Sequence, residues 1–132
     1  MNGNRFAKAG VAFLGAGLAL NGAVMMLAAE PWYEFVAKTT GPFNAHFVRD
    51  IGAAYLASGI ALLWGMRRPA HRGPLAAIAG IFLGLHALTH LFEAASGVTS
   101  LGHVIEDFPG VHLPALVVCW LAAASLRRPV EA

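Results

Sequence analysis

Two histidines and a glutamate in the third apolar stretch of the chain carry the clearest chemical signal. His86, His90 and Glu93 are spaced by four and three residues, so an α-helix places them on one face. Two imidazoles one helical turn apart can hold one metal ion, and a carboxylate one turn further on can supply another ligand. Such ligands suit zinc, iron and copper. The spacing therefore predicts a transition-metal site with these three residues as direct ligands.

A second polar group lies in the apolar stretch before it. His46, Arg49 and Asp50 again have helical spacing. A charge facing hydrocarbon costs at least about 2.5 to 3.5 kcal/mol, so these groups are expected to face the interior of a helix bundle. At ~1.5 Å per residue, Asp50 comes out level with His90. We expect His46, Asp50 and His103 as further metal ligands, and we also expect Arg49 and Asp50 to orient a ligand or bind a cofactor.

Other functions fit the same residues. The pattern HxxxH lacks the glutamate of HExxH, and HxxE reverses the ExxH order of di-iron bundles. The leading hypothesis is a metal-binding membrane protein with a redox role. The alternative is a non-catalytic accessory or small-solute-binding subunit with a structural polar cluster, and the third is a proton-coupled transporter. Haem and quinone stay open as cofactors. A metal-dependent or quinone-linked membrane oxidoreductase is the candidate activity if the chain is an enzyme.

Composition identifies the environment of these residues. The 132-residue chain is 58% hydrophobic and only 12% charged, with a mean hydropathy of +0.63. A soluble domain is roughly half apolar and about a quarter charged. Four apolar stretches, at about 7–29, 44–66, 74–96 and 109–127, each approach the ~20 residues that span a bilayer. The sequence therefore predicts one all-α domain, a four-helix transmembrane bundle.

The basic residues favour one orientation. They gather at the same side of a four-span chain, in three groups: Arg5 and Lys8, Arg67 to Arg72, and Arg127 with Arg128. By the positive-inside rule both termini are cytoplasmic, and the histidine-rich ends of the spans face outward. No continuous basic face suggests a nucleic-acid partner. The lipid bilayer is the expected partner.

Small and polar residues predict how the helices pack. Gly80 and Gly84 form a GxxxG pattern that allows close helix contact, and the glycine-rich helices favour a homo-oligomer or a place in a larger membrane complex. Asn21 is expected to make an interhelical hydrogen bond. Tyr55 is assigned to the core or the lipid belt, and His112 to a helix start or the membrane interface.

One stretch of the second span carries a family resemblance. In HFVRDIGAAYLASGIALL an arginine, Arg49, is followed three residues later by a glycine, Gly52. Together with the four-span plan and the basic cytoplasmic side, this stretch resembles the DoxX-like family of small bacterial membrane proteins. The resemblance implies a multi-pass protein of the bacterial inner (cytoplasmic) membrane, with a role in quinone-linked oxidation or redox maturation. It names no metal, substrate or catalytic residue.

Overall fold

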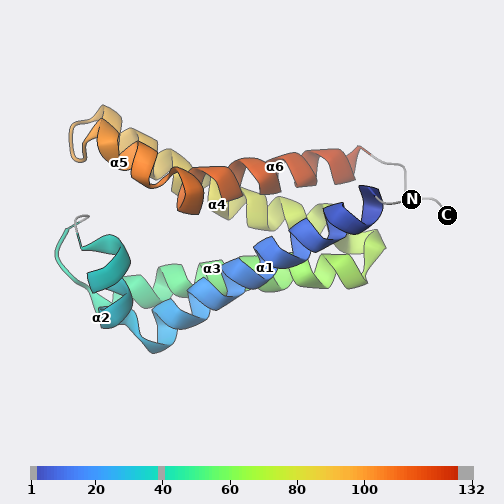
Figure 1. Cartoon of the computed structure of the whole chain (residues 1–132), viewed down its shortest axis with the longest axis horizontal. Coiled ribbons are helices and arrows are strands. Elements are labelled where there is room, and N and C mark those ends of the chain that lie inside the picture. The colour runs from blue at the N-terminus through green and yellow to red at the C-terminus, as the bar shows by residue number, and fades with distance from the viewer. Residues whose placement is uncertain (1–2, 39–40, 128–132) are drawn as a thin grey trace.

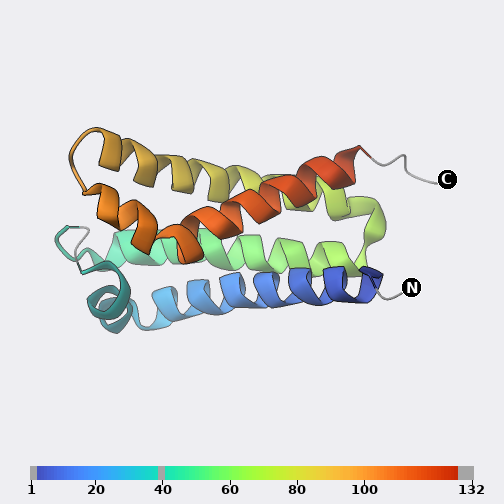
Figure 2. The ribbon, with the colours of Figure 1, turned by 45° about the horizontal axis from the view of Figure 1, so that its top comes forward.

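The chain folds into two helical hairpins. The structure is a computed structural model that describes residues 3–38 and 41–127, and within those ranges it contains no strand. The four long helices are α1 (Gly3–Leu27), α3 (Ala45–Arg67), α4 (Arg72–Ala95) and α6 (Leu113–Leu126). α1 packs on α3 and α4 packs on α6, and the two hairpins meet mainly along α3 and α4 (Figures 1 and 2).

Shorter helices cap the end of the bundle away from the termini. After α1, α2 (Ala29–Trp32) continues into a π-helical turn, Tyr33–Ala37. After α4, α5 (Leu101–Glu106) leads into a second π-helical turn, η3 (Phe108–His112), which runs straight into α6. At the opposite end a 3-10 turn, Pro69–His71, joins α3 to α4.

Four helical segments are long and apolar enough to cross a membrane. They are Lys8–Leu27, Ala45–Arg67, Pro69–Ala95 and Phe108–Leu126. Bulky apolar side chains such as Phe13, Ile78 and Leu85 are exposed along them. Large exposed apolar surfaces are rare on soluble monomers, and here they suit contact with acyl chains. The predicted four-helix, apolar architecture is therefore confirmed at this level.

The described chain begins and stops at the same end of the bundle, opposite the short helices α2 and α5 (Figure 1). That end also carries the exposed basic residues Lys8, Arg67, Arg68 and Arg127. Arg128 and the side chain of Arg5 lie outside what the structure describes. The side of the membrane that this end faces stays a prediction.

Glycines bring α1 and α3 into backbone contact. A Cβ atom built on Gly22 would collide with the carbonyl oxygen of Gly52 and with the backbone of Leu56, and one on Gly52 would lie 2.7 Å from Cβ of Met25. Gly59 meets the backbone of Ala19 in the same way. Such contact compensates for the missing hydrophobic drive between helices in lipid. The close packing of α1 on α3 therefore depends on glycines, which have no side chain to hold the two helices apart.

Polar contacts fix α2 on the bundle and the start of α3. The indole nitrogen Nε1 of Trp32 donates a hydrogen bond to Oδ1 of Asn21, at 2.9 Å. The predicted hydrogen bond of Asn21 to another helix is thus confirmed. Asn44 caps the next long helix, because its side-chain oxygen accepts from the backbone nitrogen of Phe47 at 3.1 Å.

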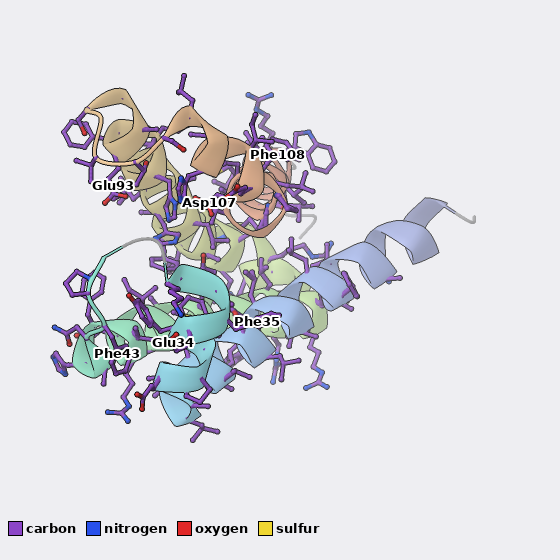
Figure 3. The ribbon with its side chains drawn as sticks, turned by 60° about the vertical axis from the view of Figure 1, so that its left-hand side comes forward. Glu34, Phe35, Phe43, Glu93, Asp107 and Phe108 are labelled. Carbon is purple, nitrogen blue, oxygen red and sulfur yellow. The ribbon has the colours of Figure 1, made fainter. Side chains whose placement is uncertain are left out.

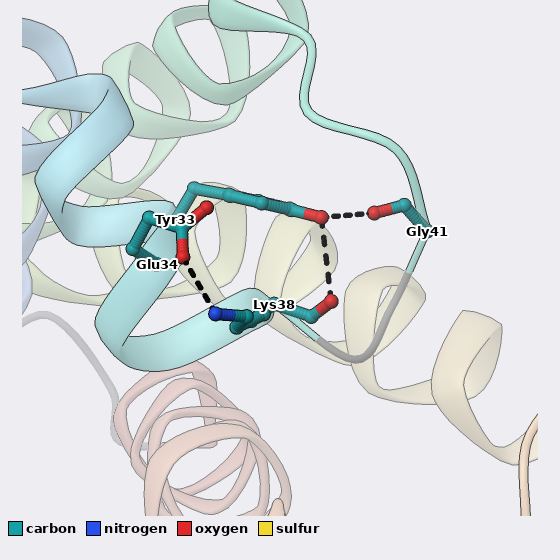
Figure 4. A network of polar contacts seen from close by, with 4 residues as sticks. All are labelled: Tyr33, Glu34, Lys38 and Gly41. Atoms are coloured by element: carbon teal, nitrogen blue, oxygen red, sulfur yellow. Dashed lines mark hydrogen bonds and ion pairs between the residues drawn. The ribbon is translucent and has the colours of Figure 1, made fainter.

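Tyr33 organises the connection between α2 and α3. Figure 3 shows the side chains of this cap, including Glu34, Phe35 and Phe43. The buried Tyr33 hydroxyl donates to the carbonyl oxygen of Gly41 and lies 3.3 Å from that of Lys38, while its ring packs on Phe43 (Figure 4). Glu34 pairs with Lys38 at 3.0 Å, and this carboxylate raises the pKa of the Lys38 ammonium above its ordinary value.

Candidate functional site

A pair formed by His90 and Asp107 marks the candidate site. Nδ1 of His90 lies 2.7 Å from Oδ2 of Asp107, and the two side chains are only 20% and 29% exposed. His90 is one turn from the end of α4, and Asp107 lies between α5 and η3, which fold back over that end (Figure 3). A carboxylate so placed fixes the imidazole and leaves Nε2 as its second, independent nitrogen.

Aromatic rings continue from His90 into the membrane-spanning part. The ring centroid of His86 lies 4.8 Å from that of His90, and the ring of Tyr55 on α3 lies 5.5 Å from His86, edge to face. Phe82 stacks on His86 at 5.8 Å. Each turn of α4 adds about 5.4 Å of depth. Titratable groups therefore line up from the cap toward the middle of the span.

His112 adds a third imidazole from η3. Its side chain is only 7% exposed, its ring centroid lies 6.4 Å from that of His90, and its Nε2 is buried with no hydrogen-bond partner among the described residues. An unsatisfied buried nitrogen costs free energy, so it calls for a reason. His112 also lines an apolar groove of about 440 Å³ between α4 and α6, together with Phe108 and Cys119.

The residues predicted from the second span lie elsewhere. His46 pairs with Asp50 at 3.3 Å, and their side chains are 87% and 64% exposed. His46 is nine residues from Tyr55, about two and a half turns, so the two side chains leave α3 on opposite sides. Arg49 uses Nε to donate to the carbonyl oxygen of Met26 at the end of α1, at 3.3 Å. The structure thus brings neither His46, Arg49 nor Asp50 to the histidines of α4.

Glu93 and His103, the other predicted ligands, join no metal-binding cluster among the described residues either. Glu93 is half-buried at the end of α4, and its carboxylate forms no ion pair with another described residue. His103 on α5 is held by Ser100, whose Oγ lies 2.9 Å from Nδ1. Among residues 8–38 and 41–127, no three His, Cys, Asp or Glu side chains are arranged to hold a metal ion. The metal site stays a prediction.

Three members of the site were not predicted. The sequence assigns no role to Asp107, which follows the third apolar stretch in a polar connection, and it assigns Tyr55 to the core or the lipid belt and His112 to a helix start or the membrane interface. The signal that could have pointed to Asp107 is an acid in the short connection that follows a half-buried histidine near a helix end. A buried charge-bearing group must find a partner, and that connection is within reach.

Comparisons of this chain with protein-family models, with curated proteins and with solved structures give no match. The resemblance to the DoxX-like family therefore stays a prediction.

Proposed function

We propose that the chain is an integral membrane protein that relays protons through Tyr55, His86, His90 and Asp107. The observation that carries this proposal is the 2.7 Å contact between His90 and Asp107, which lies where the row of rings begins at the end of the bundle. Chains of His and Asp within membrane segments are typical of proton-coupled membrane proteins. This function corresponds to the third of the hypotheses drawn from the sequence.

Each group has a distinct task in the relay. Asp107 is more exposed than His90 and exchanges protons with water at the end of the bundle. His90 accepts a proton on Nε2 while Asp107 stabilises the resulting imidazolium through Nδ1. His86 and Tyr55 extend the path inward, because the ring of His86 is in edge-to-face contact with the rings of both His90 and Tyr55. From Tyr55 the proton is proposed to continue to the opposite end of the bundle, so that flux across the membrane depends on the whole row.

Proton flux into liposomes tests the proposal. Purified protein is reconstituted with a pH-sensitive dye inside the vesicles, and a potassium gradient with valinomycin supplies the driving force. His90→Ala and Asp107→Asn should each lower the flux about tenfold or more, because general acid–base groups contribute about 100-fold or more when positioned. His71→Ala is the matched control, since His71 is exposed at the opposite end. Equal flux from all four proteins, or flux equal to that of empty liposomes, would refute the relay.

A transition-metal site is the second candidate, and it keeps the redox role. His86 and His90 are neighbours on α4, and Asp107 holds His90 as carboxylates commonly hold metal-bound imidazoles. The unpartnered Nε2 of His112 is the nearest further donor, and it would have to turn toward the pair. Zinc, iron or copper would there act as a Lewis acid or redox centre.

Elemental analysis separates the two candidates. Protein purified without a histidine tag should contain stoichiometric metal if the second candidate holds, and His86→Ala and His90→Ala should both lose it. Metal-free protein that still conducts protons supports the relay. Metal retained in both variants removes this pair as the metal site.

A further inference from the structure

One face of α3 is left uncovered by the other residues that the structure describes. α1 packs on one side of α3 through Gly52 and Gly59, and α4 packs on another through Tyr55. The exposed residues of the remaining face follow at intervals of four and three: His46, Asp50, Ala53, Ala57, Ile60 and Trp64. Alternating intervals of four and three are the spacing with which one helix packs along another.

This face differs from the other exposed faces of the spans. The exposed face of α4 carries only bulky apolar side chains over two turns and more, with Ile78, Ile81, Leu85 and Leu88 in sequence along it. The α3 face instead joins ionisable residues at one end to two alanines in its middle. The α4 face suits lipid, whereas the α3 face does not.

The charged residues at this face of α3, Arg49 and Asp50, lie within the candidate membrane span Ala45–Arg67. Asp50 is five residues into α3, about 7.5 Å from its first residue. Among the described residues Asp50 pairs only with His46, which is even more exposed, and Arg49 donates to the carbonyl oxygen of Met26 but forms no ion pair. Exposure to acyl chains would cost several kcal/mol for these groups, so membrane proteins normally bury them against a partner.

We propose that this face binds a second copy of the chain, α3 against α3, about a twofold axis along the membrane normal. Such an axis keeps every residue at its own depth, so Arg49 of each copy comes level with Asp50 of the other. Arg49 lies at the edge of the face, one residue before Asp50, so the face and its edge together supply both signs of a reciprocal ion pair, as a self-complementary dimer surface must. A partner of another kind would need only one sign.

Small side chains allow this contact to form. Ala53 and Ala57 are one turn apart at the centre of the face, which lets two helix backbones approach as in other membrane helix pairs. Ile60 and Trp64 then pack at the far end. The dimer is independent of the proton relay, because His86, His90 and Asp107 lie on other elements and Tyr55 leaves α3 on the side opposite to His46.

Disulfide trapping tests the contact. In a Cys119→Ala background, which removes the single native cysteine, Ala53→Cys and Ala57→Cys should form disulfide-linked dimers in proteoliposomes under mild oxidation. Leu85→Cys is the control on the lipid-suited face of α4 and should stay monomeric. Equal trapping of all three at high dilution in lipid would overturn the proposal, as would no trapping of either alanine variant.

Charge exchange provides the second measurement. Arg49→Asp places like charges across the twofold axis and should weaken the dimer about tenfold, whereas the double variant Arg49→Asp with Asp50→Arg restores opposite charges and should recover it. Helical content measured by circular dichroism shows that each variant is folded. A folded double variant that stays as weak as the single one, or trapping only to a different protein in host membranes, overturns the second copy as the partner.

Discussion

The carboxylate of Asp107 reaches the imidazole of His90 across seventeen residues of chain, at 2.7 Å between Oδ2 and Nδ1. This contact ties the end of α4 to the junction that starts the last membrane span. It therefore links the chemistry of the site to the packing of the second hairpin.

Asp107→Asn should weaken both the proton relay and the packing of the second hairpin. An amide cannot stabilise an imidazolium as a carboxylate does, and loss of one charged partner from a partly buried hydrogen bond costs about 1.5 to 3 kcal/mol. Because both side chains keep some exposure, we expect the lower end of that range. Unfolding in mixed micelles measures the stability. The neighbouring exposed Glu106→Gln is the control and should change it little; equal effects of both variants would contradict the structural role.

Gly22→Ala should disrupt the first hairpin. The new Cβ would overlap the backbone of Gly52 and Leu56 on α3, so the helices must separate, and such overpacking typically costs about 1 to 3 kcal/mol. Gly17→Ala on the same helix meets nothing within 4 Å and should be neutral or slightly stabilising. The difference between the two unfolding free energies is the measured quantity, and a difference near zero would mean that α1 and α3 do not touch there.

Most of the fold follows from composition and length. Four apolar stretches of membrane-spanning length leave little choice but helices, because backbone groups in lipid must be satisfied within the segment. The caps α2 and α5 were less predictable. Their segments contain Pro31, Gly97 and Pro109, which indicate breaks, yet the backbone between these breaks still forms helical turns.

The site was predictable only along one helix. Spacing alone placed His86 and His90 on a common face, and their rings do lie side by side. For His46 and Asp50, counting residues gave a depth but no direction. α1 packs on the glycines of α3 and α4 packs on Tyr55, which leaves His46 and Asp50 on the uncovered side of the helix. The contact of Asp107 with His90 depends on how the connection after α4 folds back, and the spacing of residues in the sequence does not predict that.

The ion pair of Glu34 and Lys38 makes a pH prediction. Because the pKa of Lys38 is raised above its ordinary 10.5, the pair contributes fully below that value, and its contribution is lost as pH rises through the raised pKa. Glu34→Gln should return the pKa of Lys38 toward 10.5. A titration of the lysine side chain by NMR measures it, with Glu30→Gln as control. A pKa unchanged by Glu34→Gln would show that the pair does not persist in solution.

Replacement of His112 separates packing from chemistry. The buried Nε2 of His112 has no described partner, so His112→Leu, which keeps a similar volume, should leave the unfolding free energy unchanged or raise it by about 1 kcal/mol. His90→Leu should lower it, because that change leaves the carboxylate of Asp107 without its imidazole. Unfolding of both variants in the same micelles compares them directly. If His112→Leu proves the more damaging, Nε2 must have a partner such as a bound water or ion, and metal analysis of the unaltered protein then shows whether that partner is a metal.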